Sequence, residues 1–377
     1  MVKIKEDKVL FRPEDVKPTS DEFKVLGVFN PGAVRLPSGE VLLYVRIWEK
    51  VKKDFDGKFY YSPRFTGKKK LQLELDKIKK QRIRKRGDLD FMFRDGTKRL
   101  NFISHLRRVI LDKDGLSIKS IEQKPSFFGL ENDGEFGVED PRIVKIGKKY
   151  IMTYVSLSMQ GGVSTSYAVS RDCENWKRMG IIFEQQNKDV VLFPEKINRK
   201  YVAIHRPEGS FSFVQPHMWI CYSDDLKAWE SPFSLNISKR GSWDYGRVGA
   251  GPPPLKTDKG WLLLYHGVVE TKTRKYRKAF LDYAKKMLES KFIDGYYAGA
   301  ALFDLKNPRK LIAKAPFPVL YPMMRYEKSV FDHRKIIFPS GIVKDGKDII
   351  IYSGGGDGVV SAKKMPLEEI MRQLKRV

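Results

Sequence analysis

The segment GVEDPRIVKIGKKYIMTY (137–154) carries the residues with the clearest chemical potential, since Glu139, Asp140 and Arg142 stand just before an apolar, strand-like run. A carboxyl group in this setting can donate a proton or form one half of an ion pair. Adjacent residues of a strand point to opposite faces, so we expect at most one of the two carboxylates to face a pocket. Taken alone, this spacing is more typical of a turn with a surface ion pair.

Polar residues also follow several apolar runs, at positions that a buried core would not choose. If the strands surround a common channel, the ends of the inner strands converge on its mouth and form a polar pocket there. A single histidine at such a position is usually structural, whereas a converging set indicates a site. The residues concerned are Arg46, His205, Arg206, Tyr265, His266 and Asp357.

The elements that must position these residues are strands, because short apolar or alternating runs rich in β-branched and aromatic residues recur along the chain. Meanders that repeat every roughly 40 to 60 residues cannot bury their own faces and must stack, which predicts a β-propeller with one blade for each unit. A decorated β-sandwich is the structural alternative. The runs are GEVLLYVRI (39–47), GKKYIMTYVSL (147–157), RKYVAIHRP (199–207), GWLLLYHGV (260–268) and GKDIIIYSG (346–354).

A second repeat has the pattern Ser-x-Asp-x-x-x-Trp and occurs at Ser170–Trp176 and Ser223–Trp229. An aspartate in a tight turn, followed by a tryptophan that packs between neighbouring strands, suits a hairpin in such a blade. The segment LDKDGLSIK (111–119) is a candidate for a degenerate third copy.

Two stretches, 67–86 and 272–292, interrupt the β pattern with helix-forming residues and apolar positions three and four residues apart, which predicts helical insertions. The segment PLEEIMRQLKRV (366–377) predicts a terminal helix with Pro366 in its first turn. We therefore expect an all-β fold, a single five-bladed β-propeller domain over residues 1–377. It would carry short helical insertions, as basic or helical segments near 51–100 and 270–295, and a short C-terminal helix.

The composition suits a folded, basic protein. The 377 residues are 41% hydrophobic and carry 72 basic against 46 acidic residues, a formal charge of +26 that favours anionic partners. The two cysteines, Cys173 and Cys221, match no metal or redox spacing and predict a reducing compartment. No apolar run reaches the roughly 18 residues of a membrane span and no signal peptide pattern occurs, so we expect a soluble, cytoplasmic protein with no membrane partner.

Seven segments, in this order along residues 24–362, resemble glycoside hydrolase family 130, which comprises inverting mannoside phosphorylases and related hydrolases. They are FNPGAVRLPSGEVLLYVR, GVEDPRIVKIGKKYIMTYVSLS, VLFPEKINRKYVAIHRP, SDDLKAW, GAGPPPLKTDKGWLLLYHGV, YYAGAALFDLKNPRKLI and YSGGGDGVV. The resemblance implies a five-bladed propeller whose central pocket binds mannose. It also implies that Asp140, from the GxEDPR motif, is the sole catalytic acid and passes its proton through a sugar hydroxyl.

A phosphorylase of this family would cleave a β-1,4- or β-1,2-mannooligosaccharide, or mannose linked to glucose or N-acetylglucosamine, and release α-mannose 1-phosphate. Phosphate is already a charged nucleophile, so such a site needs cations rather than a base, and it needs no metal or other cofactor. The residues that could form the phosphate cradle are Lys196, His205, Arg206, Tyr265 and His266, with Arg46 and Arg142 as contributors. The residues expected at the mannoside are Asn30, Arg46, Glu139, Arg142 and Asp357.

Two departures from the family pattern keep an inverting hydrolase open. The strand GGVSTSYAVS lacks an arginine that many family phosphorylases carry, and YSGGGD stands in place of the commoner YYGAAD. A hydrolase needs a second carboxylate to activate water, and Glu208 or Glu270 could supply it.

Two hypotheses without catalysis also stay open: a propeller that binds carbohydrate, and a nucleic-acid-binding protein. The basic run KKQRIRKR (79–86) motivates the second. The sequence disfavours it, because no nucleic-acid motif occurs and aromatic residues do not alternate with the basic ones. The same run could instead pack on a neighbouring subunit, which leaves a homo-oligomer open.

Overall fold

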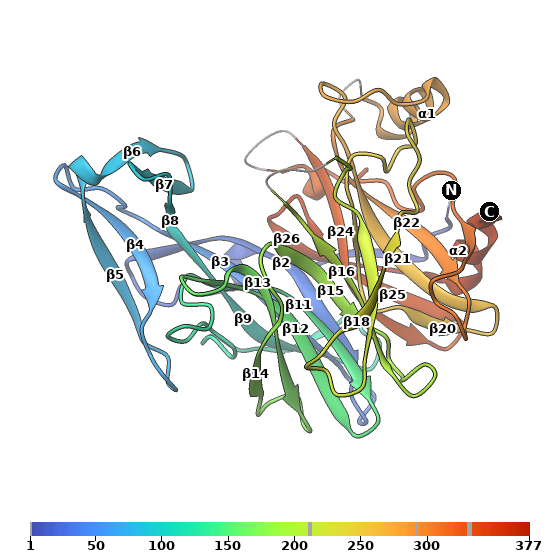
Figure 1. Ribbon diagram of the computed structural model, residues 1–377, viewed down its shortest axis with the longest axis horizontal. Coiled ribbons are helices and arrows are strands. Elements are labelled where there is room, and N and C mark those ends of the chain that lie inside the picture. Colours follow the sequence, from blue (N-terminus) through green and yellow to red (C-terminus); the bar gives the residue numbers. More distant parts are fainter. Residues whose placement is uncertain (1, 210–212, 291–292, 330–333) are drawn as a thin grey trace.

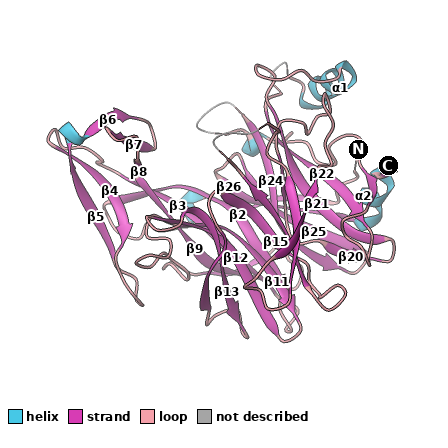
Figure 2. Ribbon diagram, in the orientation of Figure 1, coloured by secondary structure: helices cyan, strands magenta, loops and turns pink. Residues whose placement is uncertain are grey.

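The structure is a computed structural model that describes residues 2–209, 213–290, 293–329 and 334–377, and strands dominate it (Figure 2). No helix in these ranges is long and apolar enough to cross a membrane. The helices are α1 (Lys278–Leu288) and α2 (Leu367–Gln373), with three 3-10 turns, η1 (Pro13–Asp15), η2 (Lys80–Arg82) and η3 (Arg325–Glu327).

The first three sheets each contain four antiparallel strands in meander order. Sheet 1 comprises β2 (Phe23–Arg35), β3 (Val41–Val51), β9 (Phe102–Leu111) and β10 (Ile118–Ile121). Sheet 2 comprises β11 (Val138–Ile146), β12 (Lys149–Ser158), β13 (Gly162–Ser170) and β14 (Lys177–Phe183). Sheet 3 comprises β15 (Asn187–Leu192), β16 (Tyr201–Pro207), β17 (Met218–Ser223) and β18 (Glu230–Leu235).

The strands that follow sheet 3 in the chain, together with β1, form two meanders. A short parallel pairing, Gly295 with Lys335 and Tyr296 with Ile336, joins these meanders into one ten-stranded sheet. Meander 4 comprises β19 (Val248–Ala250), β20 (Leu255–Thr257), β21 (Gly260–Val269), β22 (Gly295–Phe303), β23 (Leu311–Lys314) and β27 (Lys375–Arg376). Meander 5 comprises β24 (Lys335–Asp345), β25 (Asp348–Gly355), β26 (Val359–Pro366) and β1 (Glu6–Phe11).

The predicted strand runs are confirmed. The runs coincide with β3, β12, β16, β21 and β25, of which all but β21 are the second strand of their sheet or meander and β21 is the third. The all-β prediction is therefore correct at the level of elements. Regular alternation and β-branched content were sufficient to identify these strands because each is buried over most of its length.

Adjacent sheets share apolar clusters in a cyclic order. One cluster joins sheets 1 and 2 through Tyr44 and Tyr154, and a second joins sheets 2 and 3. Further clusters join sheet 3 to meander 4 and meander 4 to meander 5. A last cluster brings Val45 of sheet 1 against Tyr352 and Val360 of meander 5, so the end of the chain packs against its beginning. Figure 1 shows the sheets fanned around the inner strands β2, β11, β15 and β24.

The Ser-x-Asp-x-x-x-Trp turns have matching geometry. Ser170 Oγ accepts the backbone N–H of Cys173 at 2.9 Å, and Ser223 Oγ accepts that of Leu226 at 2.8 Å. In each copy the tryptophan reaches the preceding sheet, since Trp176 Nε1 donates to Tyr44 OH at 2.9 Å and Trp229 packs on Phe183. The repeat therefore marks the hairpins β13–β14 and β17–β18 and helps to hold neighbouring sheets together.

The helical prediction for residues 67–86 is wrong. This stretch lies in a β insertion between β3 and β9, which comprises β4 (Phe59–Phe65), β5 (Leu73–Lys79), β6 (Ile83–Arg86), β7 (Asp90–Phe93) and β8 (Lys98–Leu100). The segment LQLEL alternates with period two, and β5 pairs with β4 along its whole length. Strand pairing thus overrode the helix propensity of the lysines and glutamates. The helices expected within 272–292 and at the C-terminus are present as α1 and α2.

Candidate active site

Four polar residues with left-handed backbone conformations lie where the inner strands meet. Asn30, Asp140 and Asp189 have φ of 50°, 49° and 54° on β2, β11 and β15, and Asp357 has φ of 55° in the turn after β25. Each of the three strands has a register shift at this point. A bulge with one left-handed residue turns a side chain out of the normal alternation, which is a frequent device beside active sites.

These residues line a pocket of about 290 Å³. Six predicted site residues lie in its wall, namely Asn30, Arg46, Asp140, Arg206, His266 and Asp357. The other described residues of the wall are Phe29, Trp48, Leu89, Phe102, Lys188, Asp189, Arg247, Tyr296, Ile336 and Phe338. Arginine, lysine and aspartate side chains thus face aromatic ones across one small space.

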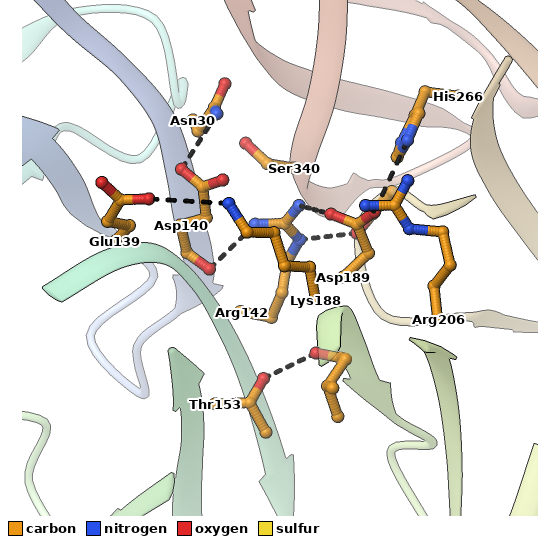
Figure 3. Close-up of polar contacts among 12 residues, drawn as sticks. Asn30, Glu139, Asp140, Arg142, Thr153, Lys188, Asp189, Arg206, His266 and Ser340 are labelled. Carbon is orange, nitrogen blue, oxygen red and sulfur yellow. Dashed lines mark hydrogen bonds and ion pairs between the residues drawn. The ribbon is translucent and has the colours of Figure 1, made fainter. Parts of the chain in front are cut away.

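Asp140 is held by two donors. Asn30 Nδ2 donates to its Oδ1 at 3.0 Å and Arg46 Nη1 lies 3.1 Å from the same oxygen (Figure 3 shows the Asn30 contact). Burial raises the pKa of Asp140, but the charges of Arg46 and Arg142 and the Asn30 hydrogen bond outweigh it and leave that pKa below its usual value. In the free site the carboxyl group is therefore ionised.

Glu139 lies beside Asp140 rather than opposite to it. Arg46 Nη2 is 2.5 Å from Glu139 Oε1, so one guanidinium group contacts both carboxylates. As expected, Asp140 is the one of the two acids that lines the pocket, while Glu139 is buried next to it. Arg142 is buried beneath the pocket, where its Nε donates to Gly251 O at 2.7 Å.

A second cluster of charge surrounds Asp189 (Figure 3). Arg206 Nη2 lies 3.1 Å and His266 Nε2 lies 3.5 Å from its Oδ2, and Arg142 Nη2 lies 3.9 Å from its Oδ1. Burial raises the pKa of Asp189, but Arg206, His266 and Arg142 outweigh this and keep the pKa low. Burial lowers the pKa of His266 to about 3, so the imidazole is neutral near pH 7 and offers an N–H without a charge.

Several buried donors around this cluster lack hydrogen-bond partners in the described part of the chain. They include Arg142 Nη2 and Arg206 Nε, and the ring nitrogen His266 Nδ1, whose role depends on the tautomer, also has no partner there. Buried polar groups in folded proteins are normally satisfied, so a set of orphan donors around one pocket indicates a site for a polar ligand. The positive charges make an anion the best fit.

Three residues predicted for the phosphate cradle do not reach the pocket. Lys196 lies in the β15–β16 hairpin turn at the far end of the sheet, with its Nζ 4.1 Å from the ring centre of Tyr201. His205 stacks on Phe183 at 4.3 Å, and Tyr265 OH donates to Asp244 at 2.9 Å. His205 and Tyr265 immediately precede pocket residues, and strand alternation sends their side chains to the opposite face.

The pocket wall also contains residues that the sequence did not predict, namely Lys188, Asp189 and Arg247. The sequence contains a signal for Lys188 and Asp189. The segment KDVVLF (188–193) places an aspartate near the start of β15, just as EDPRIV (139–144) places Asp140 near the start of β11. Lys188 Nζ lies 4.0 Å from Glu139 Oε2 and thus links the two acidic centres. No comparable pattern marks Arg247.

Apolar side chains form a further wall of the pocket. Trp48 and Phe102 come from sheet 1, and Leu89 comes from the β6–β7 loop of the insertion. That loop is fixed over the sheet because the carbonyl of Asp88 accepts from Lys50 Nζ at 2.7 Å and from Asn101 Nδ2 at 3.0 Å. An apolar surface of this kind can pack on the CH face of a sugar ring while the charged residues meet its hydroxyls.

Neither candidate base stands free in the pocket. Glu208 Oε1 lies 3.0 Å from Arg206 Nη1 and 3.6 Å from Arg247 Nη1. Glu270 contacts Arg274 and Thr273 in the segment that leads to α1. Across the described ranges no group of three or more His, Cys, Asp or Glu residues is placed to hold a metal ion.

Comparisons with known proteins show the family to which the chain is related. A family model described as beta-1,4-mannooligosaccharide phosphorylase, of glycoside hydrolase family 130, matches residues 94–376. The chain is 33% identical to a beta-1,2-mannobiose phosphorylase of Listeria innocua over 98% of this chain and 97% of that protein. It is also 33% identical to a 1,2-beta-oligomannan phosphorylase of Thermoanaerobacter sp. over 71% of this chain and 81% of that protein.

Solved structures give the same result for the fold. The beta-1,2-mannobiose phosphorylase from Listeria innocua, in its beta-1,2-mannobiose complex, superposes with a TM-score of 0.80 at 32% identity, covering 97% of this chain and 96% of that chain. A putative glycoside hydrolase from Parabacteroides distasonis shares the fold with a TM-score of 0.68 at 21% identity, covering 94% and 93%.

Proposed function

The chain belongs to glycoside hydrolase family 130, and from this we propose that it is an inverting phosphorylase that cleaves a β-linked mannoside with inorganic phosphate and releases α-mannose 1-phosphate. The observation that carries the proposal is the joint presence, in one pocket, of Asp140 and of an anion-binding cluster made by the cations Arg206, Lys188 and Arg247 with the neutral His266. The first can supply a proton and the second can hold an anion.

The bond changes follow from these two groups. A phosphate oxygen attacks C1 of the mannosyl unit from the side opposite the glycosidic oxygen, and the C1–O bond breaks with inversion. The leaving oxygen takes up one proton, which Asp140 supplies directly or through a mannose hydroxyl, and the carboxyl group is then reprotonated from solvent. Asn30, Arg46 and Asp357 would bind mannose hydroxyls, while Glu139 and Arg142 fix the position of Arg46 and Asp189.

Phosphate binding would also prepare the acid. Asp140 is ionised in the free site because of Arg46 and Arg142. A phosphate dianion beside Arg206 and Lys188 adds negative charge to the same pocket, which raises the pKa of Asp140 and favours the protonated form that catalysis requires.

We further propose that residues 1–377 form one domain, a five-bladed β-propeller in which sheets 1 to 3 and meanders 4 and 5 are the blades. The cyclic order of the apolar clusters supports this proposal, as does the pairing of the N-terminal strand β1 with β26. The central pocket then lies where the innermost strands of the blades converge.

The alternative is an inverting mannoside hydrolase, which would use a carboxylate in place of phosphate. Glu208 is the only one of the two predicted bases near the pocket, through Arg206 and Arg247. Its Oε1 is engaged by both arginines, so this oxygen is not free to position a water molecule for attack. This contact favours phosphorolysis.

Incubation with β-1,2-mannobiose and with β-1,4-mannobiose, each with and without phosphate, tests the proposal. We expect mannose 1-phosphate only when phosphate is present, and faster turnover of the β-1,2-linked substrate, as the Listeria relative suggests. Asp140→Asn should lower the rate by about 10³-fold without unfolding the protein, because Glu139 still pairs with Arg46. Release of free mannose at equal rates in both media would refute phosphorolysis.

A further inference from the structure

A second hollow, of about 690 Å³, lies on the insertion and is larger than the catalytic pocket. We call it the basic groove. Its lining contains seven cationic residues and, among the described residues, no acidic one; the cations are Lys58, Lys79, Lys80, Arg84, Lys85, Arg86 and Arg94. The insertion stands at one end of the molecule, in blue and cyan in Figure 1.

Backbone pairing brings these residues together from three parts of the insertion. The N–H of Lys80 donates to Lys58 O at 3.0 Å, where β5 leaves its pairing with β4. Arg94 Nε donates to Gln81 O at 2.9 Å and thereby joins the β7–β8 turn to the run 79–86. The cations therefore face a shared hollow, which distinguishes them from a basic run that is merely solvated.

The charges in the groove are almost uncompensated. Among the described residues, only Arg86 of the seven has an ion-pair partner, Asp54 at 2.8 Å. Like charges held close together repel one another and raise the local positive potential. A ligand with several negative charges in a row would relieve this repulsion at several points at once.

Several aromatic rings of the insertion already contact other side chains. Lys58 lies over Phe59 at 5.3 Å, Lys80 lies over Phe55 at 5.7 Å, and Arg82 lies over Phe93 at 5.4 Å. Tyr60, which lines the groove, is 9% exposed and stacks on Phe55. Proteins that bind single-stranded nucleic acid rely on exposed ring faces, so the groove favours a polyanion that is recognised through its phosphates alone.

We propose that the basic groove is a binding site for a linear polymer of phosphate groups, of the chemistry of inorganic polyphosphate. The site is separate from the catalytic pocket and does not depend on the activity proposed for that pocket. Binding should be multivalent, weak for orthophosphate and strongly dependent on salt, because each lysine or arginine acts mainly as a point charge on an exposed surface.

The test is binding of fluorescently labelled polyphosphate, followed by anisotropy over a range of salt concentrations. The variant carries Lys79→Ala, Arg84→Ala and Lys85→Ala, three exposed residues without ion pairs among the described residues. The matched control carries Lys148→Ala, Lys227→Ala and Lys310→Ala, which removes the same charge from exposed turns elsewhere. We expect the groove variant to bind at least ~10-fold more weakly than the control and to lose about 2 to 3 units of salt slope.

Equal binding by the groove variant and the control would overturn the proposal, since it would assign binding to the overall charge. Absence of binding by the wild-type protein at low salt would overturn it as well. A parallel titration uses single-stranded RNA of matched charge. Tighter, groove-dependent binding of RNA than of polyphosphate would replace the proposed ligand by a nucleic acid. Asp140→Asn should bind polyphosphate as the wild type does, so failure of the proposed catalysis and failure of this site can be told apart.

Discussion

At the scale of single residues, the pocket contains two buried carboxylates, Asp140 and Asp189, each held by its own contacts. Asp140 is held by contacts with Asn30 and Arg46, whereas Asp189 lies close to Arg206 and His266. Asp189 is the counter-charge that lets buried cations exist without a bound ligand, because unpaired buried charges are costly. Its low pKa means that it stays ionised and leaves proton transfer to Asp140.

Lys188 and Lys196 give a matched pair of substitutions for the phosphate assignment. Lys188 lines the pocket, whereas Lys196 lies in a distant hairpin turn. We expect Lys188→Ala to raise the KM for phosphate by ~10-fold or more with little change in the KM for the mannoside, because it removes one charge from the anion site. Lys196→Ala should change neither constant. The reverse result, measured by steady-state kinetics, would return the role to Lys196.

The protonation of Asp140 should depend on phosphate. Its pKa in the free site lies below the usual value, chiefly because of the charges of Arg46 and Arg142, so the group is ionised near neutral pH. Bound phosphate raises that pKa, so binding takes up protons and phosphate affinity should increase as the pH falls towards the free-site pKa. Calorimetry in two buffers of different ionisation enthalpy measures this uptake. Asp140→Asn should show less uptake, and equal uptake in both proteins would contradict the linkage.

Of the residues predicted from the sequence, Asp140, Arg206 and His266 line the pocket, and strand alternation explains the predicted residues that do not. His205 and Arg206, and likewise Tyr265 and His266, are neighbours in the chain, and only the second member of each pair lines the pocket. A sequence does not reveal which face of a strand is inward once a bulge has shifted the register, as it has on β15 and β16. The same shift conceals Asp189.

At the scale of elements, bulges and the β insertion shape the pocket. The bulges on β2, β11 and β15 turn polar residues into the pocket. The insertion contributes an apolar residue, Leu89, from outside sheets 1 to 3 and meanders 4 and 5. Strand existence could be predicted from alternation and β-branched content. The insertion was mistaken for a helix because lysine and glutamate favour helices, although LQLEL has the period of a strand.

Leu89 should affect the mannoside and not the phosphate. It is one of the apolar residues that line the pocket, with Trp48 and Phe102, and it carries no group that could bind an anion. Leu89→Ala removes a contact surface for the sugar ring, so we expect a rise of a few-fold in the KM for mannobiose and an unchanged KM for phosphate. Glu14→Ala, at an exposed position of η1, serves as the control. An unchanged KM for mannobiose together with an altered KM for phosphate would contradict a contact between Leu89 and the sugar.

At the scale of the whole molecule, the chain's two ends are joined by one strand pairing. β1 pairs with β26 from Glu6 to Phe11, and Leu10 and Phe11 are buried in the cluster shared by sheet 1 and meander 5. The strand runs named from the sequence are strands of the structure, but this pairing was not predicted, because β1 carries no signal that distinguishes it from an ordinary edge strand.

Removal of residues 2–11 should therefore destabilise the entire protein rather than a local segment. The deletion exposes the edge of β26 and the apolar surface around Val360, so we expect a decrease in Tm of roughly 10 °C or more, or failure to fold. Thermal unfolding followed by circular dichroism measures this effect. As a control, the β4–β5 turn substitution Lys69→Ala should leave Tm unchanged. A deletion variant with the Tm of the wild type would contradict a closing role for β1.

The central claim is that phosphate is the attacking group, and the balance of products tests it most directly. β-1,2-mannobiose is incubated with a known amount of phosphate, and phosphorus and proton NMR follow the phosphate, the sugar phosphate and free mannose together. If phosphate is the attacking group, each bond cleaved consumes one phosphate and yields one α-mannose 1-phosphate and one mannose. Two molecules of mannose for each bond, with the phosphate unconsumed, would contradict it.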